Sequence, residues 1–168
     1  MANQDRYEPL EASGLFEDGM ASRQPIEGTV ARGQLFEDDH LYRGTVAGQP
    51  ATEFPFEITA EIMARGQERY QIFCTPCHDQ LGTGAGIVVQ RGFRRPSSLH
   101  VDRLRAAPPG YFFDVMTNGF GAMSSYASQV PAEDRWAIAA YIRALQLSQN
   151  ANEADLAPED LELLGAQR

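Results

Sequence analysis

A Cys-x-x-Cys-His run at residues 74–78 constrains this chain more than any other feature of its sequence. Cys74 and Cys77 are the only cysteines, and His78 directly follows the second of them. This pattern is typical of c-type haem attachment. Two thiols at this spacing can form thioether bonds to the two haem vinyl groups, and the next residue offers an imidazole to the iron. We therefore predict one covalently bound haem c, held by Cys74 and Cys77, with His78 as an iron ligand.

Three other interpretations of the motif compete with haem attachment. A structural zinc site would need further ligands at zinc spacing. A thioredoxin-like redox pair would follow a strand in a βαβ unit, whereas here a helical pattern precedes Cys74 and a glycine-rich loop follows His78. A lone disulfide across so short a loop would be strained and would leave His78 unexplained. The sequence favours haem over all three.

The charge of the chain is strongly and unevenly acidic. Its 168 residues hold 23 acids and 14 basic residues, all of them arginine, for a net charge of −9. Residues 1–57 carry −7, residues 58–147 carry +2 and residues 148–168 carry −4. This balance argues against nucleic acid as a partner. No apolar stretch is long enough to span a membrane, and no signal peptide is visible, so we expect a leader or an anchor to precede Met1.

Residues 1–57 are predicted to form an irregular extension. They contain four prolines and six glycines and show no sustained helical or strand period. Apolar and aromatic residues nevertheless recur along the segment, more often than a disordered tail typically carries them. We predict that this extension docks as a strap on partner subunits. A flexible linker to an N-terminal anchor is the alternative.

A first helix is expected to lead into the cysteine motif. Thr59 is a suitable N-cap, and Glu61 lies where the helix dipole favours an acid. Residues spaced by four, four and three form one face of this helix: Ile62, Gly66, Tyr70 and Phe73. A glycine inside a helix costs about 1 kcal/mol relative to alanine, so Gly66 is expected to admit the close approach of another helix.

A glycine-rich loop follows the motif. It contains Gly82, Gly84 and Gly86, and it does not resemble a phosphate-binding loop, since it lacks the Lys-Ser or Lys-Thr pair. Beyond it, three arginines surround Phe93: Arg91, Arg94 and Arg95. These arginines form either a solvated basic loop or a contact with haem propionates or a partner, and the sequence leaves both interpretations open. Short helices are then expected at residues 98–105 and from Pro108 to a stop at Gly119.

The second axial ligand of the iron is predicted to be Met123. Haem iron with histidine on one side needs a sixth ligand, an open position or a substrate, and a thioether is common in electron transfer. Met123 follows a Gly-x-Gly loop that lets the backbone approach the porphyrin closely. Met116 lies on an apolar helical face, where methionine more often fills the core. Met116 is the first alternative, and His100 and His40 follow.

A last helix is expected after Pro131, with acids near its positive end. Its apolar residues from Trp136 to Leu145 form a broad face that can cross the first helix at Gly66–Tyr70. The acidic tail at 148–168 follows, in which residues 157–165 could form a short amphipathic helix.

Residues 58–147 resemble a class I cytochrome c domain in the order of their parts: a helix, the Cys-x-x-Cys-His motif, a loop with a proline, short helices, a methionine loop and a C-terminal helix with Trp and Tyr. The resemblance implies an all-α class I cytochrome c fold, with a long N-terminal extension and a short C-terminal tail. In this family the proximal histidine donates from Nδ1 to a proline carbonyl, which fixes the ring orientation. Pro96 is the residue that matches this proline.

The resemblance extends to a particular kind of c-type cytochrome, the mono-haem subunit (ActE) of bacterial alternative complex III. The segments that carry it are Arg6–Ser13, Gly28–Gly33, Arg69-Tyr70, Arg91–Phe93, Gly119–Met123 and Asp134–Ile138. Ser124 stands where many relatives have proline.

Such complexes oxidise membrane quinol and pass electrons through iron–sulfur and haem subunits. The resemblance therefore implies a multi-haem cytochrome subunit as a partner, a soluble cytochrome c or blue copper protein as an electron acceptor, and a peripheral or lipid-anchored place on the periplasmic side of the membrane.

The function expected from the sequence is electron transfer within a quinol-oxidising complex. The chain itself is not expected to be an enzyme, because His78 and Met123 would fill both axial positions of the iron. A freely diffusing or anchored cytochrome c shuttle is the first alternative, although a shuttle does not need the extension at 1–57. An enzyme or gas sensor with a displaceable sixth ligand is the second.

Overall fold

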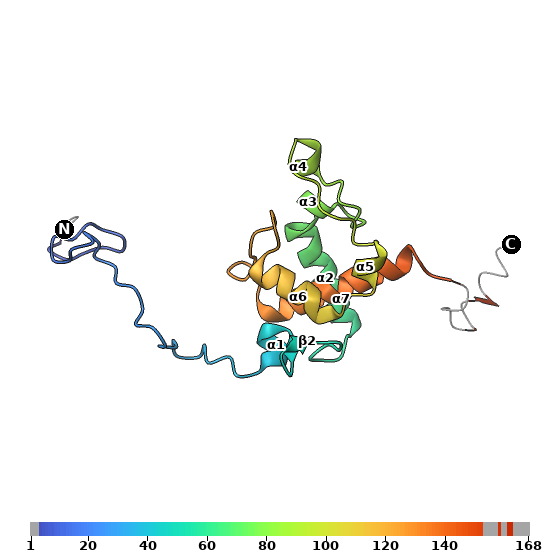
Figure 1. Ribbon diagram of the computed structural model, residues 1–168, viewed down its shortest axis with the longest axis horizontal. Helices are drawn as coiled ribbons and strands as arrows, with labels where there is room; N and C mark the ends of the chain where they lie inside the picture. The colour runs from blue at the N-terminus through green and yellow to red at the C-terminus, as the bar shows by residue number, and fades with distance from the viewer. Residues whose placement is uncertain (1–3, 153–157, 159–160, 163–168) are drawn as a thin grey trace. The chain divides into compact units, whose positions relative to one another are not determined.

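The computed structural model describes residues 4–152, 158 and 161–162. It divides into two units, Met1–Phe36 and Glu37–Arg168. The sequence analysis placed the end of the extension at residue 57. The structure instead assigns residues 37–57 to the helical unit (Figure 1). The difference arises because this segment packs against helices of the same chain.

The first unit has no hydrophobic core among its described residues. A loop is closed by backbone hydrogen bonds from Ser13 N to Gly19 O (2.8 Å) and from Ala21 N to Glu11 O (3.0 Å). Arg23 stiffens it with an ion pair to Asp18 (2.7 Å). Nine of its large apolar side chains are exposed, and Leu10 is the extreme case at 91%.

The second unit is built mainly of helices, so the predicted all-α class is confirmed. Its elements in the described residues are α1 (Asp39–Arg43), β1 (Thr45–Val46), β2 (Gln49–Pro50), α2 (Ala60–Phe73), α3 (Thr75–His78), α4 (Ile87–Gln90), α5 (Asp102–Arg105), α6 (Pro109–Asn118) and α7 (Ala132–Ser148). The two short strands form an antiparallel hairpin. The structure contains no helix in its described residues that is long and apolar enough to cross a membrane.

The predicted crossing of the first and last helices is confirmed. The N-cap of α2 is Thr59, whose side chain accepts a hydrogen bond from Ile62 N (3.3 Å). A Cβ at Gly66 would lie 2.1 Å from the carbonyl oxygen of Ala137 in α7, so the two backbones touch at this point. One turn further along, the rings of Tyr70 and Tyr141 pack with centroids 5.4 Å apart.

A charged pair fixes the same crossing at its edge. Asp134, near the start of α7, accepts two hydrogen bonds from the guanidinium of Arg65 in α2, at 2.8 and 2.9 Å. The carboxylate of Asp134 is largely buried, whereas Arg65 keeps contact with solvent. Such a fork-shaped pair restricts the angle between the helices as well as their separation.

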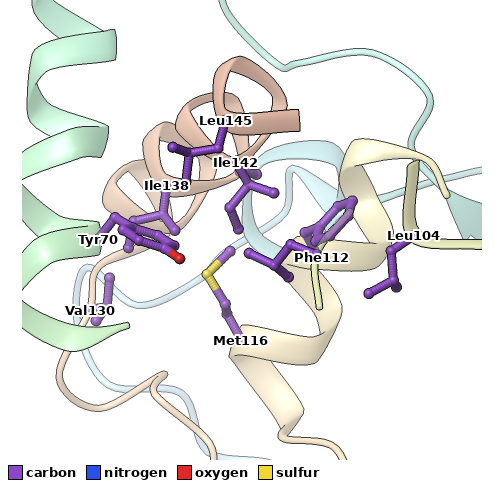
Figure 2. Close-up of a cluster of buried hydrophobic side chains, with 10 residues drawn as sticks. Tyr70, Leu104, Phe112, Met116, Val130, Ile138, Ile142 and Leu145 are labelled. Atoms are coloured by element: carbon purple, nitrogen blue, oxygen red, sulfur yellow. The ribbon is translucent and has the colours of Figure 1, made fainter. Parts of the chain in front are cut away.

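One side of α7 builds the larger hydrophobic core, shown in Figure 2. Ile138, Ile142 and Leu145 from α7 pack there with Tyr70 of α2 and with α6. The remaining buried members are Leu99, Leu104, Phe112, Met116, Val130 and Ala139. This core lies directly behind the cysteine motif, since Phe73 and Cys74 pack against it.

The other side of α7 is covered by residues 37–57. Trp136 is fully buried there and donates from Nε1 to the carbonyl oxygen of Leu41 (2.8 Å). Its ring stacks on Phe113 at 4.7 Å and meets Phe54 edge-on at 5.9 Å. The apolar residues of this segment therefore find cover on their own domain.

Several elements differ from the expectation. The hairpin, α1 and α4 were not predicted, and the helix expected at 98–105 is confined to α5. The helix expected at 157–165 lies almost entirely outside the described residues. Each missed element is five residues or shorter, too short to show a helical period in the sequence.

We expect Gly66→Ala to destabilise the helical unit by about 3 kcal/mol, because the new methyl group would overlap the backbone of α7. Gly14→Ala is the matched control, because no atom lies within 4 Å of a Cβ built at Gly14 and the φ angle of Gly14 is not positive. Urea unfolding followed by far-ultraviolet circular dichroism measures both. Equal stability of the two variants would contradict the contact.

Candidate functional site

The cysteine motif forms a helical turn at the end of α2. Cys74 N donates to Tyr70 O (2.9 Å) and His78 N donates to Cys74 O (2.8 Å), so α2 continues almost directly into α3. Both cysteines are half-buried and neither is in a disulfide. The sequence folds this way because Pro76 occupies the first turn of α3, where a missing N–H costs little.

The environment of Cys74 does not suit a reactive redox thiol. Burial, followed by the neighbouring Cys77, raises the pKa of the Cys74 thiol to about 12. A thioredoxin-like nucleophile needs the opposite shift, toward a stable thiolate. A thioether, which carries no charge, suits the same buried position.

The imidazole of His78 has the properties of a metal ligand. Burial lowers its pKa, while the charge of Asp79 opposes the shift, so the neutral ring is favoured near pH 7. Its Nδ1 is buried and has no hydrogen-bond partner among the described residues. The predicted bond from Nδ1 to the carbonyl of Pro96 is thus not formed here; that carbonyl oxygen packs on Gly84, 2.5 Å from where a Cβ would lie.

Asp79 organises the loop that follows the motif, and sequence reasoning missed it. Its carboxylate accepts hydrogen bonds from Leu81 N (2.7 Å), Thr83 N (3.2 Å), Thr83 Oγ1 and Ala85 N (2.8 Å). Its backbone carbonyl accepts another from Tyr70 Oη (3.0 Å). An aspartate followed by several glycines, typical of side-chain-capped turns, was the available signal.

The backbone of Asp79 adopts a conformation that favours glycine, with φ 59° and ψ 179°. Burial disfavours ionisation of its carboxyl, but the hydrogen bonds from Thr83, Ala85 and Leu81 outweigh burial and lower the pKa to about 2. These bonds offset the strain of the backbone, and they hold the loop against the carbonyl of His78, which accepts from Gly84 N (3.0 Å).

Residues 96–100 close the loop from its other side. Leu99 N donates to Gly82 O (2.8 Å), and His100 Nε2 lies 2.6 Å from Leu81 O. Arg95 donates to Thr83 O (3.1 Å). The ring of His100 is therefore used to fix this loop, and the structure does not support it as an axial ligand.

Met123 lies in a tight loop on the border of the larger core. Phe120 and Met123 exchange backbone hydrogen bonds of 2.9 and 3.0 Å, and a Cβ at Gly119 would lie 2.6 Å from Met123 O. The half-buried Met123 packs against the same core as Phe73 and Cys74. The structure thus brings the methionine loop and the cysteine motif to one core; ligation of the iron by Met123 stays a prediction.

The two remaining ligand candidates are Met116, which is a member of the larger core itself, and His40, which packs against Trp136. Met116 is buried inside the larger core, where Figure 2 shows its sulfur among Tyr70, Ile142 and Phe112. His40 packs edge-on to Trp136 at 5.7 Å, and its Nε2 lies 2.9 Å from Glu53 O. Both have structural partners that account for their positions.

The donor set fits a haem better than a closed metal site. No group of three or more His, Cys, Asp or Glu side chains that could hold a metal ion occurs in the described part of the chain. A structural zinc site, which needs four such ligands, is therefore not supported. Two free thiols, a half-buried imidazole whose buried Nδ1 has no partner among the described residues, and a thioether at the core that Cys74 contacts would suit a covalently attached porphyrin.

A comparison with protein-family profiles points the same way. Residues 61–142 match the protein-family profile described as "Cytochrome C oxidase, cbb3-type, subunit III". No curated protein sequence matches the chain significantly. Among solved structures, the chain is similar to one titled "Kuenenia stuttgartiensis reducing HAO-like protein complex Kustc0457/Kustc0458", at 22% identity and a TM-score of 0.48. That similarity spans 56% of this chain and 48% of the other.

We expect Asp79→Ala to destabilise the helical unit by about 2 kcal/mol, because three backbone N–H groups and the Thr83 hydroxyl lose a charged acceptor. Asp79→Gly removes the same acceptor but also relieves the backbone strain, so its loss should be smaller by about 1 kcal/mol. Urea unfolding of both variants tests this pair. Identical losses would show that the backbone of Asp79 carries no strain.

The cost of Asp79→Ala should also depend on pH. The pKa of this carboxyl is about 2 in the folded state against an ordinary value of 3.8, so its contribution is complete above about pH 4. It is lost progressively as the pH falls through 2. The difference in the free energy of unfolding between the variant and the original protein should therefore be smaller at pH 3 than at pH 6. Urea unfolding curves at the two pH values measure it.

Proposed function

We propose that this chain is a class I c-type cytochrome and an electron-transfer subunit with one covalently bound haem c. The match of residues 61–142 to a cytochrome c family profile supports this proposal. We further propose that its parent assembly is a membrane quinol-oxidising complex of the alternative complex III type. The observation that carries the proposal is the convergence of the cysteine motif and the methionine loop on one hydrophobic core.

Each residue of the site has a distinct role under this proposal. Cys74 and Cys77 would form the thioether bonds, with the helical turn at 74–78 setting the spacing of the two sulfurs. His78 and Met123 would hold the iron. Pro96 would offer a carbonyl to His78 Nδ1, since it already packs on the loop that contacts His78.

The haem would supply reversible one-electron chemistry between ferric and ferrous iron. The protein's contribution would be to hold the iron through His78 and Met123. With both side chains bound to the iron no ligand position would be left for oxygen or a substrate, so the chain itself is proposed to perform no bond chemistry.

The first unit is proposed to attach the chain to other subunits, notably a multi-haem cytochrome. Its apolar side chains are exposed while it has no described core, a combination that favours burial against another protein. The periplasmic side of the membrane is the proposed location, because covalent haem is attached outside the cytoplasm. A soluble cytochrome c or blue copper protein is the proposed acceptor.

Substitution of the two methionines tests the ligand assignment. We expect Met123→Ala to abolish the ferric absorption band of the thioether–iron bond and to lower the redox potential. Met116→Ala should keep that band but cost about 2–5 kcal/mol of stability, because it leaves a cavity in the core. Loss of the band in Met116→Ala alone would reverse the assignment.

Attachment to a larger complex is tested on native gels of gently solubilised membranes, stained for haem and probed for this chain. We expect the chain to run with a large multi-haem assembly. A variant with Leu10→Ser and Leu15→Ser should be released, because both side chains are exposed by more than three-quarters. Val46→Ser, an exposed apolar residue of the helical unit, is the control. If the original chain runs alone in the soluble fraction, it is a diffusible shuttle.

A further inference from the structure

One stretch of the chain is basic although the protein as a whole is acidic. Residues 80–101 contain Arg91, Arg94 and Arg95 and no Asp or Glu, so they carry +3 while the rest of the chain carries −12. Arg95 is used within the domain, where it donates to Thr83 O. The side chains of Arg91 and Arg94 are exposed and make no hydrogen bond or ion pair within the described residues. Their charges are therefore available to a partner.

Large apolar side chains are exposed beside these two arginines. Phe93 lies between them in sequence and is 69% exposed, and Ile87 at the start of α4 is 55% exposed. The chain folds back here, because Arg91 N and Phe93 N both donate to Val88 O, at 3.1 and 3.2 Å. This turn keeps Ile87, Arg91, Phe93 and Arg94, all exposed, within one short stretch of chain, which we call the α4 surface.

The α4 surface is mounted directly on the cysteine motif. Gly86, immediately before α4, donates from its N–H to Cys77 O (3.1 Å), and a Cβ there would lie 2.3 Å from Pro76 O. Figure 1 shows α3 and α4 together at one end of the helical unit, with α1 and β2 at the opposite end. A protein bound at α4 would thus lie beside the attachment point of the porphyrin. Because electron tunnelling weakens steeply with distance, this position favours transfer.

We propose that the α4 surface is the docking site of an acidic redox protein that exchanges electrons with the haem. This inference rests on the proposed function and adds the chemistry of the partner. Aromatic residues and arginine are enriched in the centres of protein interfaces. The two free guanidinium groups select acidic side chains, and Phe93 supplies the apolar contact. Binding to anionic lipid usually needs four to eight clustered basic residues, more than this surface holds.

The test compares two double substitutions that change the net charge equally. Arg91→Gln with Arg94→Gln removes the charge of the α4 surface. Arg43→Gln with Arg103→Gln is the matched control, since both arginines are exposed and Arg43 lies in α1 at the opposite end. The probe is the hydroquinone of an acidic flavodoxin, and stopped-flow spectroscopy follows its reduction of the ferric holoprotein at low and high salt.

At low salt, the α4-surface variant is expected to react about 3–10-fold more slowly than the original protein, and the control less than about twofold more slowly. The difference between the two variants should vanish at high salt, because the charges are then screened. Phe93→Ser should also slow the reaction, but with an unchanged dependence on salt. Equal rates for the two double variants at low salt would overturn the proposal.

Two further measurements separate the explanations. Vesicles of phosphatidylcholine with phosphatidylglycerol test a lipid partner: binding that is lost in the α4-surface variant, with flavodoxin rates unchanged, would replace the protein partner by a membrane. Reduction by dithionite tests the haem alone. If dithionite reduces every variant normally, equal flavodoxin rates for the two double variants contradict only the proposed docking site. If the original chain holds no reducible covalent haem, the proposed function itself is wrong.

Discussion

The backbone contact between Gly66 of α2 and Ala137 of α7 determines where the groups of the candidate site lie. Because no side chain separates the helices there, α2 is fixed in height and direction, and its last turn delivers Cys74 to the core. The same contact sets α7, whose two sides then bury the larger core and Trp136. The bidentate pair of Arg65 and Asp134 restricts rotation about the contact. The site proposed to hold a rigid porphyrin thereby lies next to a helix crossing that leaves little room for adjustment.

Sequence reasoning succeeded where the signal was local or periodic. The N-cap at Thr59 and the glycine at a helical contact each follow from a few neighbouring residues. The sequence could not show that Asp79 takes a backbone conformation suited to glycine, because its compensating hydrogen bonds come from a loop that exists only when folded. It also could not show which surface covers the aromatic residues of 37–57. Spaced apolar residues reveal that cover is needed, and only the tertiary contacts with Trp136 reveal that the chain supplies it itself.

The two loops that border the site are rigid for the same physical reason. Each has glycines where a side chain would collide with backbone, at Gly84 and Gly86 in one loop and at Gly119 in the other. Each is also closed by backbone hydrogen bonds to itself or to the motif. Rigid loops change little when an electron arrives, and a small reorganisation favours rapid transfer. Among the described residues, these loops leave one buried polar atom of the motif without a partner, Nδ1 of His78. A hydrogen bond from this atom would fix the orientation of the imidazole if the ring bound a haem iron.

The exposed surfaces of the two units differ in chemistry, and this difference bears on the kind of contact each can make. The first unit exposes many apolar side chains and carries excess acid, while it has no described core of its own. Extensive apolar burial is typical of permanent interfaces between subunits. The α4 surface instead combines two free arginines with one exposed aromatic ring, and charge of this kind mainly accelerates encounter and is weakened by salt. If the first unit bound the chain permanently to a complex and the α4 surface bound a second protein only transiently, the chain would connect a stationary electron donor with a mobile acceptor. A subunit at the end of an electron-transfer complex requires this arrangement.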